Sequence, residues 1–585
     1  MNRTRQMMGW LATGLLGVGL LCGAALGAGV APVPGSALPD AWGRAGGTVT
    51  LSVSEVEGKP VTISGAIAPS RGKQVTVRIP ASTPPGRLRV QFVNDSTNKT
   101  ITTRDVEVLA PETPNDPEAR RVQLLIDPNL NETQAGDLLA RLLLLPGIGT
   151  LYSRETLPAP ISRSSPNTKA AQPAATSPCG GTLADIQLGA GITLEAALNL
   201  LAQEGGEDVW YPDPLTRWGA GALSQTLPAM SQSAQAQTQL PNLKAQVNQQ
   251  SFHYVLAPVS PRVVLGSPAG GMTGAGVTIA VLDTGFSPQL DPTHELTDKQ
   301  GIRLARVSPP INALVPFDPA NPAPSLAGSQ DFWEGHGTQV AILAAGALSG
   351  SAPAAGVLPI KVCLEGAGQA SCSTKDVLRG LCVALSQVPA QQLVINLSLG
   401  GASPTGAIHA VLNWAQLQGA VVVAAGGNQH QASNPTDPEE YPAAFARSHA
   451  PSQAALPLLA VASTTPPTWS ARSLVASALW PVSGFSTRGS YLNISAPGEA
   501  LDLGHVQLYS GTSFAAPLVA GAAALARQAN PNMTAAALRT YMLSSGRVIA
   551  GTSGNLSTSK VAVTGVAANQ DALSQGLPML RLSGY

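Results

Sequence analysis

Charged and aromatic residues are scarce in this chain. Only 12% of its 585 residues are Asp, Glu, Lys or Arg, and 4% are aromatic. The 34 basic and 34 acidic residues balance to a formal net charge of zero. Proteins that bind nucleic acid gather Lys and Arg on one surface, and the sequence has no such basic patch. We therefore expect no nucleic-acid partner, and the length predicts two to four domains.

Cysteine is also rare, with five in the whole chain. Apart from Cys22, which lies in the apolar N-terminal segment, four cysteines remain and permit three pairings. Cys363 and Cys372 flank a glycine-rich loop, so a bridge between them is favoured in an oxidising compartment. Cys179 has no evident partner, and Cys382, in a predicted helix over 375–385, is expected as a buried free thiol. None has the surroundings of a catalytic cysteine.

The first 28 residues have the order of a secretory signal peptide. Arg3 and Arg5 precede an apolar run over 7–26, and small residues follow it. An uncleaved membrane anchor is the alternative, because a spanning helix needs ~20 apolar residues. Lipoprotein processing at Cys22 is disfavoured by the Leu21 before it. We expect a secreted, cell-surface or periplasmic protein.

Two further regions precede the part of the chain that carries chemistry. Residues 45–110 alternate polar and apolar at period two between turn-rich breaks, which predicts a small β-sandwich acting as an accessory module. Residues 119–215 show a β-α-β-β-α-β order, interrupted by a polar, flexible insertion at 161–178, which predicts a ferredoxin-like α+β domain. We expect a linker at 216–250, the chemical domain at 251–565 and a tail at 566–585.

Three separated motifs each carry one member of a nucleophilic triad. Asp283 ends the apolar run Val-Thr-Ile-Ala-Val-Leu, His336 opens a helix-like run after Gly335, and Ser513 opens another within Ser-Gly-Thr-Ser-Phe-Ala-Ala-Pro. A carboxylate at a strand end and two helix starts converge at one edge of a parallel sheet. A serine hydroxyl becomes a nucleophile when an oriented base takes its proton. We assign Ser513 as nucleophile, His336 as general base and then acid, and Asp283 as the group that orients the imidazole.

The reaction also needs a donor for the oxyanion of its tetrahedral intermediate. Asn428 is the candidate, because it follows a β-branched buried run that ends in two glycines. Taken alone, each of these four residues has an ordinary structural explanation as a turn former, a core histidine or a helix cap. Their joint occurrence in register with one fold favours the catalytic interpretation.

With these motifs, the chain resembles the subtilisin-like (subtilase) serine endopeptidases over roughly residues 250–560. The segments Val394–Gly401, Tyr441–Ala444 and Ser495–Gly498 lie between the triad motifs in the order of that family. The resemblance implies an α/β fold with a parallel sheet flanked by helices. It also implies a substrate cleft lined by Ser398, Leu399, Gly400, Gly401, Ala425, Gly426 and Gly427.

The resemblance further implies partners and cofactors. Protein or peptide substrates are expected, no cofactor is needed for the chemistry, and a monomer is expected. Many relatives wrap a structural calcium at the loop corresponding to 346–362, but this version contains no carboxylate, so calcium is possible yet unsupported there. The domain at 119–215 has the layout of a subtilase propeptide, which would make it an intramolecular inhibitor removed by self-cleavage between about 212 and 255.

Other enzyme classes fit less well. Ser513 lacks the Gly-x-Ser-x-Gly setting of α/β-hydrolases, and His-Glu-x-x-His zinc spacing is absent. A sedolisin would replace His336 with an acidic residue. Two alternatives stay open: a catalytically restricted or inactive subtilase scaffold that serves as a surface binding module, and a protein that cleaves only itself.

Overall fold

The computed structural model describes most of the chain from residue 38 onward. The described residues are 38–56, 61–64, 74–94, 97–111, 119–161, 176–220, 272–318, 320–321, 323–331, 335–365, 370–431, 437–448, 454–464, 482–501, 503, 509–545, 547–548 and 578–579. The predicted signal peptide, most of the insertion at 161–178, most of the linker and nearly all of the tail lie outside them. Within the described part, no helix is both long and apolar enough to cross a bilayer.

The most N-terminal described strands form two small sheets around one apolar core. Four strands pair in the order β1-β6-β5-β3, and β2 pairs with β4. The period-two alternation explains the packing, because every second residue of β2 and β4 is buried. The first strand begins before the predicted boundary at 45. The strands are β1 (Ala41–Arg44), β2 (Thr48–Ser52), β3 (Val61–Ser64), β4 (Gln74–Arg78), β5 (Gly86–Asn94) and β6 (Lys99–Leu109).

The next elements follow the order β-α-β-β-α-β. Their four strands form an antiparallel sheet in the order β10-β7-β9-β8. Leucines from both helices pack with the sheet in one buried cluster. Helix α1 starts at a capping box between Asn131 and Gln134. The elements are β7 (Arg121–Ile126), α1 (Glu132–Leu143), β8 (Thr150–Thr156), β9 (Thr182–Gln187), α2 (Leu194–Gly205) and β10 (Val209–Pro214).

The start of the predicted linker is a strand rather than a flexible connection. Strand β11 (Arg217–Ala220) pairs antiparallel with β15 (Ala370–Ser373) of the following domain. Trp218, in the middle of β11, is buried, and its indole N–H donates to the Ser403 carbonyl at 3.2 Å. The apolar side chain and the ladder hydrogen bonds together order the start of the segment that the sequence assigned to a linker.

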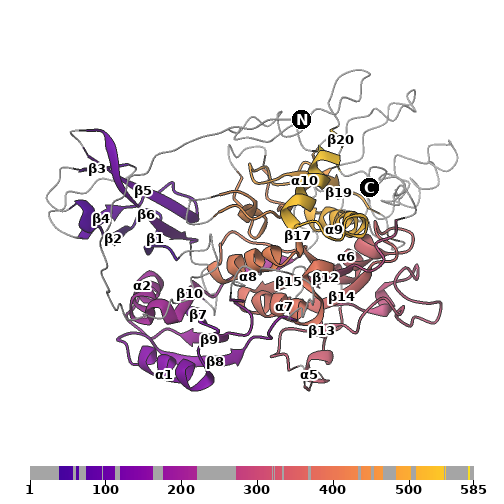
Figure 1. Ribbon diagram of the computed structural model, residues 1–585, viewed down its shortest axis with the longest axis horizontal. Helices are drawn as coiled ribbons and strands as arrows, with labels where there is room; N and C mark the ends of the chain where they lie inside the picture. The colour runs from indigo at the N-terminus through magenta and orange to yellow at the C-terminus, as the bar shows by residue number, and fades with distance from the viewer. Residues whose placement is uncertain are drawn as a thin grey trace, which may run out of the picture. The chain divides into compact units, whose positions relative to one another are not determined.

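A nine-stranded sheet organises the remaining chain (Figure 1). Its order is β13-β14-β12-β16-β17-β18-β19-β21-β20, and every neighbouring pair is parallel except β20 with β21. The strands are continuous apolar runs because helices cover both faces of the sheet. The strands are β12 (Thr278–Asp283), β13 (Ile311–Asn312), β14 (Gly356–Lys361), β16 (Leu393–Leu397), β17 (Val421–Ala425), β18 (Leu459–Thr464), β19 (Ile494–Pro497), β20 (Arg547–Val548) and β21 (Pro578–Met579).

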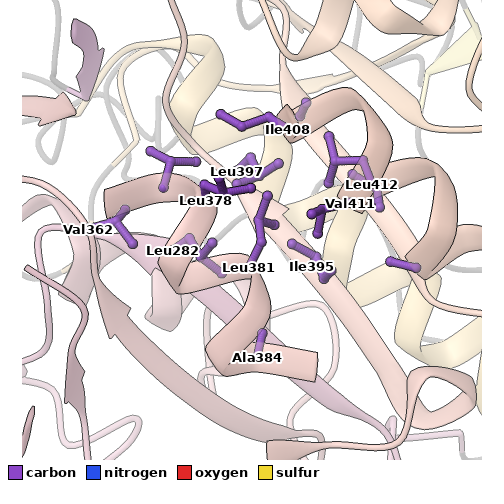
Figure 2. Packing of buried hydrophobic residues seen from close by; sticks show 14 of the residues in the cluster. Leu282, Val362, Leu378, Leu381, Ala384, Ile395, Leu397, Ile408, Val411 and Leu412 are labelled. Carbon is purple, nitrogen blue, oxygen red and sulfur yellow. The ribbon is translucent and has the colours of Figure 1, made fainter. Parts of the chain in front are cut away.

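Helices cover the two faces of this sheet. Leu282 and Leu397 share a buried cluster with α7 and α8, and Figure 2 shows their side chains interleaving. The alternate strand residues Ile279 and Val281 share a second cluster with α6, α9 and α10. This is the predicted α/β architecture with a parallel sheet between helices. The helices are α5 (Ala323–Leu326), α6 (His336–Ala345), α7 (Thr374–Gln387), α8 (Gly406–Leu417), α9 (Thr512–Ala529) and α10 (Ala535–Ser545).

Two disulfides join the four described cysteines. Cys363 bonds to Cys372, as the glycine-rich loop between them indicated. Cys179 bonds to Cys382, so the prediction of a free thiol at Cys382 was wrong. The two residues are 203 positions apart, and only the docking of β9 and its neighbours onto α7 brings them together. Helical periodicity showed that Cys382 is buried but could not show what it meets.

Candidate active site

The ends of β12 and α6 place a carboxylate and an imidazole in contact. Strand β12 ends at Asp283, which is buried, and α6 begins at His336. His336 Nδ1 lies 2.7 Å from Asp283 Oδ1. An ionised carboxylate can accept hydrogen bonds but cannot donate them. The contact with Asp283 therefore favours the histidine tautomer that carries its proton on Nδ1. Nε2 is then the basic nitrogen of the ring.

Ser513 lies in the first turn of α9, and the residue after it contacts the histidine. Its neighbour Phe514 packs against the imidazole with the ring centroids 5.2 Å apart. The Ser513 carbonyl accepts a 2.7 Å hydrogen bond from the hydroxyl of Ser398, which follows β16. The start of α9 is therefore fixed against both α6 and the central sheet. The three predicted triad positions come together at one edge of the sheet, each at the strand end or helix start that the sequence indicated.

Asn428 follows β17 and contacts the same helix start. Its Oδ1 accepts hydrogen bonds from the backbone N–H of Thr512 at 2.8 Å and from the Thr512 hydroxyl at 3.0 Å. With the amide oxygen occupied in this way, its NH₂ group is directed away from Thr512. Asn428 is only partly buried, and its amide nitrogen would lie 3.5 Å from a Cβ placed on Gly511, two residues before Ser513.

The structure adds a buried carboxylate, Asp331, that the sequence interpretation missed. Its Oδ1 accepts from the Thr284 hydroxyl at 2.8 Å, and its Oδ2 accepts from the N–H and hydroxyl of Thr338 at 2.7 and 2.8 Å. The Thr284 hydroxyl in turn accepts from the Gly337 N–H at 2.8 Å. Asp331 thus ties the residue after Asp283 to the first turn that carries His336. Its only sequence signal is an acidic residue shortly before the histidine motif.

The glycines predicted to line the substrate cleft are already paired with protein backbone. Gly400 and Gly219 exchange two hydrogen bonds, at 3.0 and 2.8 Å, so β11 lies along this segment. Gly401 and Tyr441 exchange another two, at 2.9 and 2.8 Å. Ser398 is fully buried, and its hydroxyl donates to the Ser513 carbonyl.

The second wall of the predicted cleft is formed by the residues before Asn428. Gly426 donates to the Val461 carbonyl at 2.8 Å, and Gly427 donates to the Thr512 hydroxyl at 3.1 Å. Gly427 has a φ of +99°, which a side chain would disfavour. Ala425 ends β17 and is buried, and Leu399 on the opposite wall is buried as well.

Comparisons with known proteins agree with this geometry. The model of the subtilase family matches residues 274–571, which is half of the chain. This chain belongs to the subtilase family. Subtilisin Savinase of Lederbergia lenta is 32% identical over 282 residues, covering 46% of this chain and 84% of that relative. An alkaline protease of Shouchella clausii is also 32% identical over 282 residues and is covered over 59% of its length.

This subtilase is therefore in the class of serine endopeptidases. A solved cold adapted subtilisin-like serine proteinase is 28% identical and covers 53% of this chain and 90% of its own. Its TM-score of 0.37 is too low to carry an argument about this fold. The class assignment rests on the family model and the curated relatives.

The loop at which many subtilases hold calcium is closed by hydrogen bonds in this one. Glu295 Oε2 accepts from the N–H groups of Leu348 and Ser349 at 3.0 and 2.7 Å, and its Oε1 accepts from the Ser349 hydroxyl at 2.7 Å. Donor groups surround this carboxylate, and a cation would need acceptors instead. The loop does not fit calcium. Across the described residues, no cluster of His, Cys, Asp or Glu is arranged to hold a metal.

Proposed function

We propose that this subtilase is a secreted endopeptidase, made as a self-processing precursor, that hydrolyses peptide bonds through an acyl-enzyme on Ser513. The observation that carries the proposal is the 2.7 Å contact of Asp283 with His336, with the start of α9 packed against the same imidazole through Phe514. The apolar run and small residues of the N-terminal segment support export.

In the proposed reaction, His336 Nε2 removes the proton from the Ser513 hydroxyl as the oxygen attacks the substrate carbonyl. The Asn428 NH₂ group donates to the oxyanion that forms, and the N-terminus of α9 adds backbone N–H groups of favourable polarity. His336 then gives its proton to the leaving amine. Water repeats the sequence to release the acyl group. Asp283 accepts the hydrogen bond from Nδ1 throughout and stabilises the imidazolium.

The domain at 119–215 is proposed to inhibit the enzyme until it is cut away from the catalytic chain. Two contacts support this role. Asp213 on β10 accepts from the N–H groups of Gly406 and Ala407 at 2.9 and 2.8 Å, at the start of α8. Strand β11 then runs along Gly400, where a substrate backbone would pair. Because β11 is ordered up to Ala220, we place the cut beyond it, between 221 and 255.

Labelling with a fluorophosphonate tests the proposal. The wild-type protein is expected to react at Ser513 and to show a new N-terminus beyond residue 220. The Ser513→Ala variant should remain unlabelled and uncut. Equal processing of both proteins would refute self-cleavage. Folded, processed wild type that resists the probe would refute the triad assignment and favour a binding scaffold.

A further inference from the structure

Three acidic side chains close together in sequence differ in their partners. Asp437 lies 2.9 Å from His430 Nδ1, and Glu439 pairs with Arg447 at 2.6 Å. Glu440 is only 8% exposed, and no cationic side chain pairs with it among the described residues. Its one polar side-chain contact is a 3.3 Å hydrogen bond from Gln429. Burial without a compensating charge raises the pKa of Glu440 to about 7.

Glu440 lies between the two walls of the predicted substrate cleft. A Cβ placed on Gly400 would come within 2.7 Å of Glu440 Oε1, and one placed on Gly427 would come within 3.0 Å of its Cβ. The Glu440 side chain therefore lies beside both glycine segments, with its carboxylate next to Gly400 and its Cβ next to Gly427. Gly427 is followed directly by Asn428, so the Glu440 side chain adjoins the segment that carries the proposed oxyanion donor.

We propose that Glu440 is a specificity-determining residue that selects Lys or Arg as the residue whose carbonyl is attacked. A buried carboxylate gains most from a cationic partner that enters the same pocket, because the pair is formed away from water. A Lys or Arg side chain that enters between the glycine walls would supply the cation that the acid lacks, whereas an apolar side chain would leave the acid without a partner. This inference rests on the proposed protease function.

Peptide substrates that differ only at the cleaved residue test the selection. With processed enzyme, kcat/KM for Lys and Arg substrates should exceed that for the Ala substrate by about 100-fold, the range of a buried charged pair. Glu440→Gln should remove most of this ratio, chiefly by lowering kcat/KM for the Lys and Arg substrates. Glu440→Asp should retain part of the Lys-to-Ala ratio, because it keeps the negative charge on a shorter side chain.

Glu439→Gln is the matched control, since that carboxylate already pairs with Arg447. It should leave the Lys-to-Ala ratio unchanged. A wild-type enzyme that prefers Ala or Phe, or a ratio unaffected by Glu440→Gln, would overturn the inference and leave the protease function intact. Failure to cleave any of the substrates would refute the protease function, and the inference would fall with it.

A second inference comes from the Cys179–Cys382 disulfide. Cys179 precedes β9 and Cys382 lies on α7, so the bond joins the inhibitor-like domain to the catalytic domain across the proposed cut. Hydrolysis between 221 and 255 breaks one peptide bond and leaves the disulfide intact. We infer that the N-terminal chain stays covalently attached after processing, which gives a two-chain enzyme.

Buried polar contacts hold the two parts together beside the disulfide. Lys375 lies 3.2 Å from Asp185, and Arg379 lies 2.5 Å from Glu155. All four side chains are largely buried, so these pairs are shielded from solvent. A covalent link keeps the inhibitor domain at a high effective concentration, and rebinding becomes intramolecular. The cut enzyme is therefore expected to be only partly active, and slower than enzyme freed of the domain, until the link or the domain is lost.

Denaturing gels with and without dithiothreitol test the link. Processed wild type should run as one band without reductant and as two with it, and peptide mapping should recover the Cys179–Cys382 pair. The paired variant Cys179→Ser/Cys382→Ser should give two bands in both conditions and at least about tenfold more activity. The variant Cys363→Ser/Cys372→Ser should behave as wild type, because that bridge lies on one side of the cut.

Two bands from wild type without reductant would overturn the attachment while confirming cleavage. One band in both conditions, with the native N-terminus retained, would refute self-processing instead, and the attachment of a separate chain would fall with it.

Discussion

The side-chain oxygen of Asn428 accepts the backbone N–H of Thr512 at 2.8 Å, one residue before Ser513. The amide is thereby fixed by the helix start that also carries the nucleophile. A shift of the Asn428 amide would move the start of α9 with it, so the amide donor and the Ser513 nucleophile keep their separation. Preorganised donors of this kind stabilise charge without reorganising during the reaction.

Replacing Asn428 with Leu should lower kcat far more than it raises KM. Loss of one oxyanion donor in subtilisin costs about 10²–10³ in kcat, and we expect the same range here. Steady-state kinetics on one peptide substrate measures both constants. Thr512→Val is the informative companion, since it removes one of the two bonds to the amide oxygen, together with the acceptor of the Gly427 N–H, and should cost about tenfold. A change in KM alone for Asn428→Leu would exclude the oxyanion role.

Asp331→Asn should lower the free energy of unfolding and impair His336 as the general base. The change turns one carboxylate oxygen into a donor, so either the Thr284 hydroxyl or the Thr338 N–H and hydroxyl lose their acceptor, at the turn that positions His336. A buried network of this kind contributes about 2–4 kcal/mol to the free energy of unfolding. We also expect the acidic limb of the kcat/KM pH profile to move, because the environment of the imidazole changes. Asp318→Asn, at an exposed position, serves as the control. It should change neither the free energy of unfolding nor the pH profile.

Glu440→Gln should make the Ser513→Ala precursor more stable above pH 7. The pKa of Glu440 is raised from 4.5 to about 7, so its folded form favours the proton. Wild-type stability from this group is complete below pH 4.5 and is lost as pH rises through 7. Tyr491, Glu439 and Asp437 are the titratable neighbours. Denaturant unfolding should show a gain of about 1–3 kcal/mol at pH 8 and little difference at pH 4.5. A gain independent of pH would contradict this account.

Glu295→Ala should destabilise the loop at 346–362, and added calcium should not restore it. The substitution leaves two N–H groups and one hydroxyl without their acceptor, which costs about 3 kcal/mol. Thermal unfolding of the Ser513→Ala precursor, with and without calcium, measures the effect. Ser349→Ala removes one of the three bonds and should cost about 1 kcal/mol. Recovery of the melting temperature with calcium would show that the loop binds the ion.

Local patterns in the sequence were sufficient for much of the fold. Apolar runs that ended in Asp283 and before Asn428 indicated buried parallel strands, and both exist as β12 and β17. The helix starts at His336 and Thr512 were visible because small and apolar residues follow the motifs without a break. Such signals can be read from the sequence alone because they depend on the periodicity within one helix or strand.

Contacts between distant elements were not visible in the same way. Cys382 was predicted to be free because nothing near it in sequence suggests Cys179. Residues 217–220 were assigned to a linker because their strand partner, β15, lies far along the chain. Asp331 and Glu440 resemble ordinary acidic residues until the structure buries them beside the site.

The sequence by itself determined the class of fold and the family and predicted the triad residues, because each motif carries its own geometry at a strand end or a helix start. The tertiary structure alone decided which buried charges have partners, which cysteines meet and where β11 lies. These depend on the distance between segments far apart in the chain, and that distance follows from the packing of the whole core rather than from any local pattern.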